Sequence, residues 1–168
     1  MPLSLYDVTI PAFLRGFRNM AKHLDQAKAH ADANGIAHDE LLTARLYPDM
    51  LPLTGQVQRA SDTAKFVAVR AAGLTAPPMA DTEKTFDELQ ARIAATVDYL
   101  KGVPKDAFDG REDSEVVLKF GPQSFPFKAR DYVTVFALPN YYFHVTTAYD
   151  ILRHKGVKLG KLDFIGGP

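Results

Sequence analysis

One regular apolar stripe constrains the fold of this chain more than any other feature. Between residues 53 and 71, apolar side chains recur at intervals of three and four residues. The positions of the stripe are Leu53, Val57, Ala60, Ala64, Val67 and Ala71. Because an α-helix turns by about 100° per residue, this spacing places them all on one face. With Gly73 as a C-terminal stop, the segment is predicted to be a long helix with one buried face.

Three further segments have helical character and cover residues 4–35, 85–102 and 130–154. Ser4 is a favoured N-cap residue for the first of them, and Gly35 is a favoured C-terminal stop. The second opens with a threonine and a glutamate in capping-box spacing. The sequence therefore predicts four long helices in all.

The period of the sequence changes to two between the third and the last of these helices. Residues 115–120 alternate in polarity, residues 121–123 have turn composition, and the alternation resumes at residues 125–127. A proline at position 126 confines its strand to the edge of a sheet. This pattern predicts a small β-hairpin before the last helix, and Pro139 is expected to kink that helix.

Two shorter pieces complete the predicted fold. Residues 38–46 are expected to form a short helix, and residues 157–168 are expected to form a tail. The whole chain, residues 1–168, has the length of one domain. The fold class is therefore all-α, a single four-helix bundle with one small hairpin.

The composition narrows the possible functions. Twenty lysine and arginine residues balance twenty aspartate and glutamate residues, so the formal net charge is zero. Proteins that bind nucleic acid or anionic membranes need a basic excess, and no apolar stretch approaches the roughly 20 residues that span a bilayer. A neutral net charge also gives little resistance to self-association. We expect a cytoplasmic homodimer that binds neither nucleic acid nor membrane.

A single histidine lies inside the aromatic-rich last helix. The chain has no cysteine, so thiolate nucleophiles and cysteine metal ligands are excluded. By helical spacing, His144 shares a face with Asn140 and Tyr141, and Gln56 lies at the edge of the stripe described above. These four residues are predicted to form a small polar pocket for a ligand in the bundle interior. The alternative is a core histidine that is paired with one hydrogen-bond partner.

The other histidines do not add to this cluster. His23 and His30 lie seven residues apart on the first helix, among lysine, aspartate and glutamine neighbours. Because charged residues are mostly exposed, we expect both histidines to lie on a solvated face.

The aromatic side chains of the last helix cannot all face one core. Tyr142 and Phe143 point away from the predicted inner face, toward another helix, the hairpin or a second subunit. Ordinary core packing explains them, and so does a dimer face or an apolar pocket.

The closing phrases of the chain, residues 139–154 and 159–166, resemble the DinB/YfiT-like superfamily, and within it a branch of unknown function. The resemblance covers nearly the whole chain and implies a DinB-like bundle. Superfamily members that bind metal use three histidines, one from the second helix and two from the last. The resemblance places His144 on the first of that last pair, Ala148 on the second, and Gln56 near the ligand of the second helix. It therefore implies that His144 is the only retained metal ligand.

Three hypotheses for function follow. The first is a DinB-like protein without metal or other cofactor, which binds an unidentified small molecule at His144. The alternative is a metal-dependent hydrolase or transferase of the superfamily that uses His144, since histidine can act as a base or a ligand near neutral pH. The third is a purely structural dimer with a filled core around His144. Whether the chain is an enzyme stays open between them.

Overall fold

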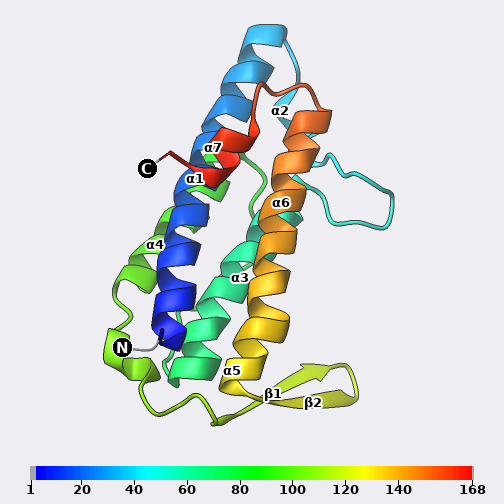
Figure 1. Cartoon of the computed structure of the whole chain (residues 1–168). Coiled ribbons are helices and arrows are strands. Elements are labelled where there is room, and N and C mark those ends of the chain that lie inside the picture. Colours follow the sequence, from blue (N-terminus) through cyan, green and yellow to red (C-terminus); the bar gives the residue numbers. More distant parts are fainter. Residues whose placement is uncertain (1–2, 168) are drawn as a thin grey trace.

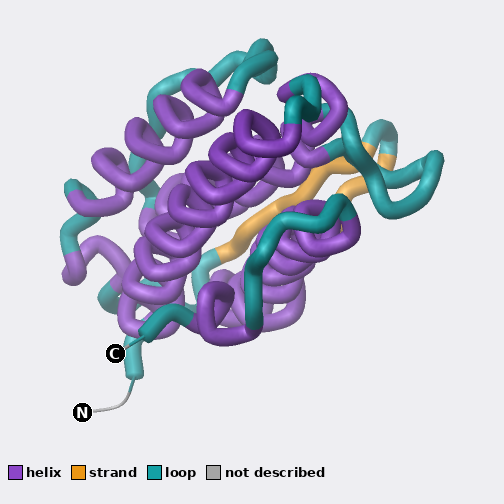
Figure 2. The backbone as a smooth tube through the Cα atoms, turned by 90° about the horizontal axis from the view of Figure 1, so that it is seen from above, coloured by secondary structure: helices purple, strands orange, loops and turns teal. Residues whose placement is uncertain are grey.

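The computed structural model describes residues 3–167 (Figure 1). In chain order its elements are α1 (Leu5–Asn34), α2 (His38–Leu42), α3 (Leu53–Ala72), α4 (Phe86–Lys101), the 3-10 helix η1 (Lys105–Phe108), β1 (Glu115–Phe120), β2 (Gln123–Lys128), α5 (Ala129–Asp131), the π-helical segment η2 (Tyr132–Ala137), α6 (Leu138–His154) and α7 (Lys161–Ile165). Helices α1 and α3 each pack against both α4 and α6. The predicted all-α four-helix bundle is confirmed, and Figure 2 shows it from above.

The buried stripe of α3 lies at the centre of the bundle. All of its six predicted positions, from Leu53 to Ala71, have no exposed surface. Three of the six are alanine, whose short side chain leaves room for α4 and α6 to pack on either side. Among the described residues, no helix is long and apolar enough to cross a membrane.

The helix ends follow the predicted capping chemistry. The Ser4 hydroxyl accepts a hydrogen bond from the Asp7 amide at 3.2 Å, and α1 ends at Gly35 in a left-handed conformation. The Thr85 hydroxyl accepts from the Glu88 amide at 3.1 Å at the start of α4. Each cap satisfies a backbone donor that the helix itself leaves free.

The hairpin also forms as predicted, at one end of the bundle. Strands β1 and β2 are antiparallel, and Phe120 pairs with Gln123 across the turn. Val116 and Leu118 are buried, and Phe120 and Phe125 continue the same face toward the turn with exposed rings. On the opposite face Val117 is exposed. Pro126 has no amide hydrogen, which a two-stranded sheet tolerates because both strands are edges.

The second helix is shorter than predicted. It covers His38–Leu42 rather than residues 38–46. The Thr43 hydroxyl bonds to the Asp39 carbonyl at 2.6 Å, and the Leu53 amide bonds to the Ala44 carbonyl at 2.9 Å. The second bond closes the segment between them into a loop, so the helix cannot continue through it.

The last helix is interrupted rather than simply kinked. A π-helical turn, η2, separates the short α5 from α6, and Pro139 follows it in the first turn of α6. Proline cannot donate to the carbonyl four residues earlier and its ring clashes with that carbonyl. The wider π turn, a frequent form of insertion into a helix, relieves this conflict ahead of the proline.

The predicted C-terminal tail contains one short helix at residues 161–165, which was not expected from the sequence. Helix α7 begins where the Gly160 amide bonds to the Asp163 carboxylate at 2.7 Å. It lies on α1, where the Asn19 side-chain amide donates to the Phe164 carbonyl at 2.9 Å. The ring of Phe164 contacts Tyr149 of α6 at a centroid distance of 5.5 Å. Five residues are too few to show a helical period in the sequence.

Candidate functional site

The predicted site residues divide between two faces of α6. Gln56 of α3 forms a hydrogen bond with His144 of α6. Asn140, one turn before His144 on α6, forms a hydrogen bond with Thr63 of α3. Tyr141 instead points to α1, where its hydroxyl donates to the Phe13 carbonyl at 3.0 Å. The structure therefore brings Gln56, His144 and Asn140 to one interface between α3 and α6, and it leaves Tyr141 on another.

The hydrogen bond between Gln56 and His144 has a fixed direction. Gln56 donates its amide Nε2 to the Leu51 carbonyl at 2.9 Å, so its Oε1 is the atom that faces His144. That oxygen lies 2.8 Å from Nδ1 of His144. Because an amide oxygen only accepts, Nδ1 must carry the hydrogen. The Nε2 atom of His144 is then an acceptor, and it has no hydrogen-bond partner within residues 3–167.

His144 is neutral at physiological pH. Burial, helped by the positive charge of Arg59, lowers the pKa of its imidazole from 6.5 to about 4. The side chain keeps 8% of its surface exposed. A neutral ring with one free lone pair is a hydrogen-bond acceptor for a molecule that approaches from solvent.

A second series of hydrogen bonds lies beside the one from Leu51 through Gln56 to His144. The Asn140 side-chain amide donates to the Thr63 hydroxyl at 2.7 Å, and that hydroxyl donates to the Arg59 carbonyl at 2.7 Å. Asn140 and His144 are four residues apart on α6, which places them on the same face. Asn140 uses its donor on Thr63, so its side-chain oxygen is free to accept.

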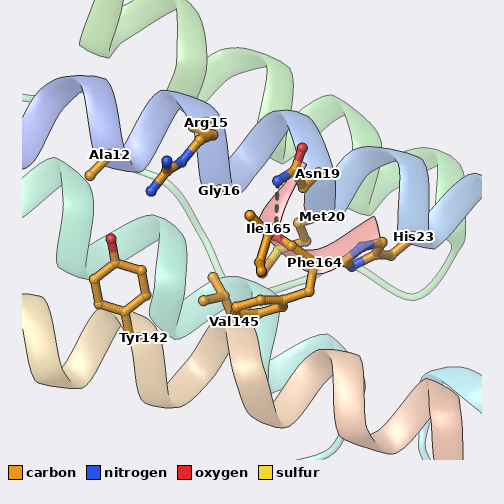
Figure 3. Close-up of a pocket in the computed structure, with 10 residues that line it drawn as sticks. All are labelled: Ala12, Arg15, Gly16, Asn19, Met20, His23, Tyr142, Val145, Phe164 and Ile165. Atoms are coloured by element: carbon orange, nitrogen blue, oxygen red, sulfur yellow. Dashed lines mark hydrogen bonds between the residues drawn. The ribbon is translucent and has the colours of Figure 1, made fainter. Parts of the chain in front are cut away.

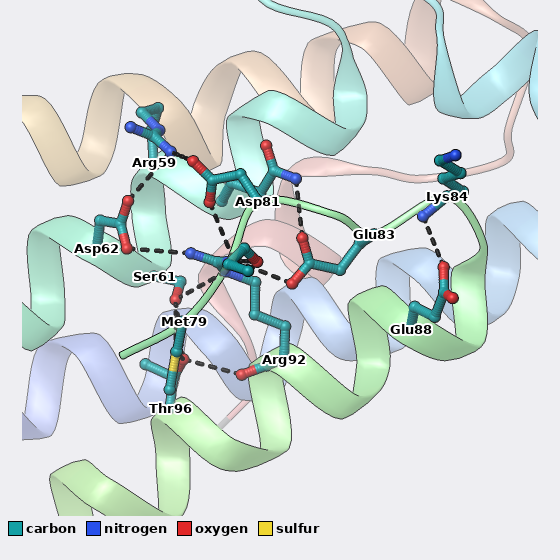
Figure 4. Close-up of polar contacts among 12 residues, drawn as sticks. Arg59, Ser61, Asp62, Met79, Asp81, Glu83, Lys84, Glu88, Arg92 and Thr96 are labelled. Carbon is teal, nitrogen blue, oxygen red and sulfur yellow. Dashed lines mark hydrogen bonds and ion pairs between the residues drawn. The ribbon is translucent and has the colours of Figure 1, made fainter. Parts of the chain in front are cut away.

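An ion-pair network fastens the loop between α3 and α4 beside this interface (Figure 4). Arg92 of α4 is buried, and its guanidinium binds Asp62 at 3.0 Å and Glu83 at 2.9 Å. Arg59 pairs with Asp62 at 3.1 Å and also with Asp81. Three carboxylates thus hold two guanidinium groups, and this arrangement fixes Arg59 near His144.

Comparisons with known proteins identify the family of this chain. The family model of a domain of unknown function, DUF1993, matches residues 5–165. The chain belongs to the DUF1993 family. Its structure is similar to the 1.83 Å crystal structure of a DinB family member protein from Shewanella denitrificans, with 38% sequence identity and a TM-score of 0.92. The match covers 98% of this chain and 93% of that chain. No curated protein matches the chain.

The donor atoms of this DUF1993 domain do not fit the three-histidine metal site of the superfamily. His144 has one ring nitrogen bonded to Gln56, and Ala148 has no side-chain donor atom. Within residues 3–167, no three histidine, aspartate or glutamate side chains are grouped so that they could hold a metal ion. A stable zinc or nickel site needs three or four protein ligands.

Tyr141 belongs to the core between α1 and α6. Its side chain is fully buried, and burial raises the pKa of its hydroxyl well above the usual value of 10.0. A Cβ atom at Gly16 would lie only 2.3 Å from that hydroxyl. The glycine is therefore what allows Tyr141 to reach the Phe13 carbonyl.

Two residues at the interface were missed by the sequence prediction. Arg59 and Thr63 follow Gln56 by three and seven residues, so the helical spacing that selected Gln56 also places them on its face.

The aromatic residues Tyr142 and Phe143 stay at the surface, with 39% and 55% of their area exposed. The ring of Phe143 lies 5.3 Å from that of His144.

Proposed function

We propose that this DUF1993 domain is a metal-free, DinB-like binding protein whose ligand site lies at His144. The proposal depends on one observation, the hydrogen-bond chain from the Leu51 carbonyl through Gln56 to His144 Nδ1. These hydrogen bonds orient the imidazole of His144 and leave its Nε2 atom as an acceptor at the edge of solvent. A buried polar group that is oriented in this way is preorganised for a partner.

The neighbouring atoms suggest the chemical class of the ligand. Asn140 offers a second acceptor on the same face of α6, and Phe143 offers an exposed aromatic ring beside His144. A ligand with a hydroxyl or amino group on an apolar body would donate to the acceptors and pack on the ring. Ionic partners fit less well, because the carboxylates nearest to Arg59 already neutralise it.

The metal-dependent hydrolase or transferase is the alternative. It would need further ligands beside His144, and the donor set described above favours the metal-free proposal. A general base at His144 is also disfavoured, because a pKa of about 4 is far from the neutral pH at which a base works best.

The test combines metal analysis with nitrogen NMR of the histidine rings. Protein purified without an affinity tag is expected to contain no stoichiometric zinc or nickel, and His144 is expected to give the spectrum of an Nδ1–H tautomer. Stoichiometric metal that disappears in His144→Ala would overturn the proposal, and so would an Nε2–H tautomer.

A matched pair of probes tests the acceptor itself. Phenol can donate a hydrogen bond to Nε2, whereas anisole has the same ring without the donor. Saturable shifts of the His144 ring are expected with phenol only, and they should vanish in His144→Ala. Equal binding of both probes would mean that the ring contacts Phe143 without using the histidine.

We also propose that the protein forms a homodimer. The apolar side chains that support this lie on the hairpin, on η2 and on α6 and are more than one-third exposed. They are Val117, Phe120, Phe125, Val135, Tyr142 and Phe143. Clusters of exposed apolar side chains are common at interfaces. Sedimentation should give a dimer that Val135→Ser with Phe143→Ser converts to monomer, and a monomeric wild type would refute it.

A further inference from the structure

A second candidate site lies on the opposite side of α6, between α1, α6 and α7 (Figure 3). It is a cavity of about 110 Å³. Its lining includes Arg15 and His23 of α1, Tyr142 of α6 and Phe164 of α7. None of these residues takes part in the His144 interface, so the cavity is separate from the ligand site proposed there. Tyr142 is also one of the side chains of the proposed dimer face.

The deep end of the cavity holds a buried polar atom without a partner. His23 is only 4% exposed, and within the described residues its Nε2 atom makes no hydrogen bond. This corrects the sequence prediction of a solvated His23, because α7 covers it. Burial lowers the pKa of His23, against an opposing effect of Asp163, so the ring is neutral. A buried polar group without a hydrogen-bond partner destabilises the fold, so this nitrogen indicates a place where a ligand atom would form the bond.

The other end of the cavity is open and positively charged. Arg15 is exposed and forms no ion pair within residues 3–167, and Tyr142 is 39% exposed. In Figure 3 the guanidinium of Arg15 and the hydroxyl of Tyr142 lie at the same end of the cavity, away from His23. A guanidinium and a phenol hydroxyl are both donors suited to a carboxylate.

Between the two ends the wall is apolar. Met20 and Val145 are buried there, and Phe164 and Ile165 of α7 form the cover. An engineered cavity of about 150 Å³ holds one benzene molecule. A cavity of 110 Å³ therefore has room for a body of roughly four carbon atoms.

The C-terminal segment is shaped to fit against this site. Gly166 has a φ of +79°, and a Cβ atom there would lie 2.8 Å from the side-chain nitrogen of Asn19. Asn19 in turn donates to the Phe164 carbonyl. No residue of α7 is buried, so this short helix covers the cavity while remaining easy to displace.

From these contacts we infer that the cavity under α7 binds a short, unbranched monocarboxylate with a terminal hydroxyl group. The carboxylate lies at Arg15 and Tyr142, the carbon chain lies against Met20, Val145 and Phe164, and the hydroxyl reaches Nε2 of His23. A hydroxyl both donates and accepts, so it satisfies this nitrogen in either tautomer of the ring.

Three probes of equal chain length test each end of the site separately. They are 5-hydroxypentanoate, pentanoate, which lacks the hydroxyl, and 1,5-pentanediol, which lacks the carboxylate. In amide NMR titrations, 5-hydroxypentanoate is expected to bind about tenfold more tightly than either analogue. The shifted amides should lie in α1 around Arg15 to His23 and in α7.

Two variants and a control separate recognition from folding. Arg15→Gln should weaken 5-hydroxypentanoate and pentanoate about tenfold but leave the diol unchanged. His23→Leu should remove the preference for the hydroxylated acid. Arg18→Gln, an exposed arginine one turn away that does not line this cavity, should change neither. The inference is overturned if none of the probes binds saturably at millimolar concentration, or if both variants bind all three probes as the wild type does.

Discussion

The two sides of α6 differ in whether their buried histidines have hydrogen-bond partners. On the α3 side, His144 is bonded to Gln56 and the buried Arg92 holds several partners at once. On the α1 side, His23 is buried as deeply but its Nε2 is left unpaired next to a cavity. The paired side should contribute stability and fixed orientation, whereas the unpaired side gives up stability at a place where a ligand can enter.

The largest expected effect comes from breaking the paired side at Arg92. Arg92→Leu leaves Asp62 and Glu83 partly buried without their shared cation, and it should cost about 3–5 kcal/mol of unfolding free energy. Urea denaturation measures the loss. The control Arg18→Leu removes an exposed arginine of α1 and should stay within about 0.5 kcal/mol. A loss below about 1 kcal/mol at Arg92 would mean that the network does not hold the loop between α3 and α4.

The next effect is a pH dependence from His144. Its pKa is 6.5 when unfolded and about 4 when folded, so the unfolded state binds more protons between these values. The contribution of the neutral His144 ring to the free energy of unfolding is fully present above pH 6.5. It falls by up to about 3 kcal/mol as the pH drops toward 4. Comparing wild type with His144→Leu across this range isolates the contribution from that of the carboxylates. Parallel curves for the two proteins would contradict the lowered pKa.

A matched pair of substitutions tests the contrast between the two histidines directly. His144→Leu leaves the Gln56 oxygen without its donor and should cost about 1–3 kcal/mol. His23→Leu removes a nitrogen that has no partner, so it should be neutral or stabilising. Thermal and urea denaturation of both variants give the comparison. Equal destabilisation would show that His23 has a partner in solution, such as an ordered water molecule.

The bundle and its hairpin could be predicted because their signals are local. The stripe from Leu53 to Ala71 fixes the buried face of α3, and the Ser4 and Thr85 caps fix where two other helices begin. Each of these signals lies within one element, so no knowledge of the tertiary structure is needed to use it.

The burial of His23 could not be found in the same way. Nearby Lys22, Asp25 and Gln26 are polar, but the residues on its own face, Asn19 and Ala27, are both buried. Helical spacing would therefore have indicated that His23 lies on a buried face. It would not have identified α7 as the cover, because this helix has too few residues to show a helical period. The interruption at η2 likewise depends on how Pro139 is accommodated in three dimensions, which composition does not determine.

Helical spacing anticipated part of the arrangement around His144, whose role as a ligand site stays a prediction. Spacing on α6 and α3 grouped His144, Asn140 and Gln56, and the structure has these three side chains at one interface. Helical spacing places Tyr141 on the same face as His144. In the structure, the missing side chain at Gly16 leaves room for the Tyr141 ring, whose hydroxyl bonds to α1 instead. Which neighbouring helix a side chain meets is a property of packing, so the sequence leaves it open.

The smallest predicted effect is local and concerns the cover of the unpaired side. Asn19→Ala removes the hydrogen bond to the Phe164 carbonyl, worth about 0.5–1.5 kcal/mol, and α7 has no buried residue to compensate. Amide hydrogen exchange should therefore speed up in α7 while the core of α3 is unchanged. Asn34→Ala is the control, because Asn34 bonds only within the end of α1. If exchange in α7 does not change, contacts such as that of Phe164 with Tyr149 hold the cover in place, and His23 is shielded more firmly than a ligand site on this side would require.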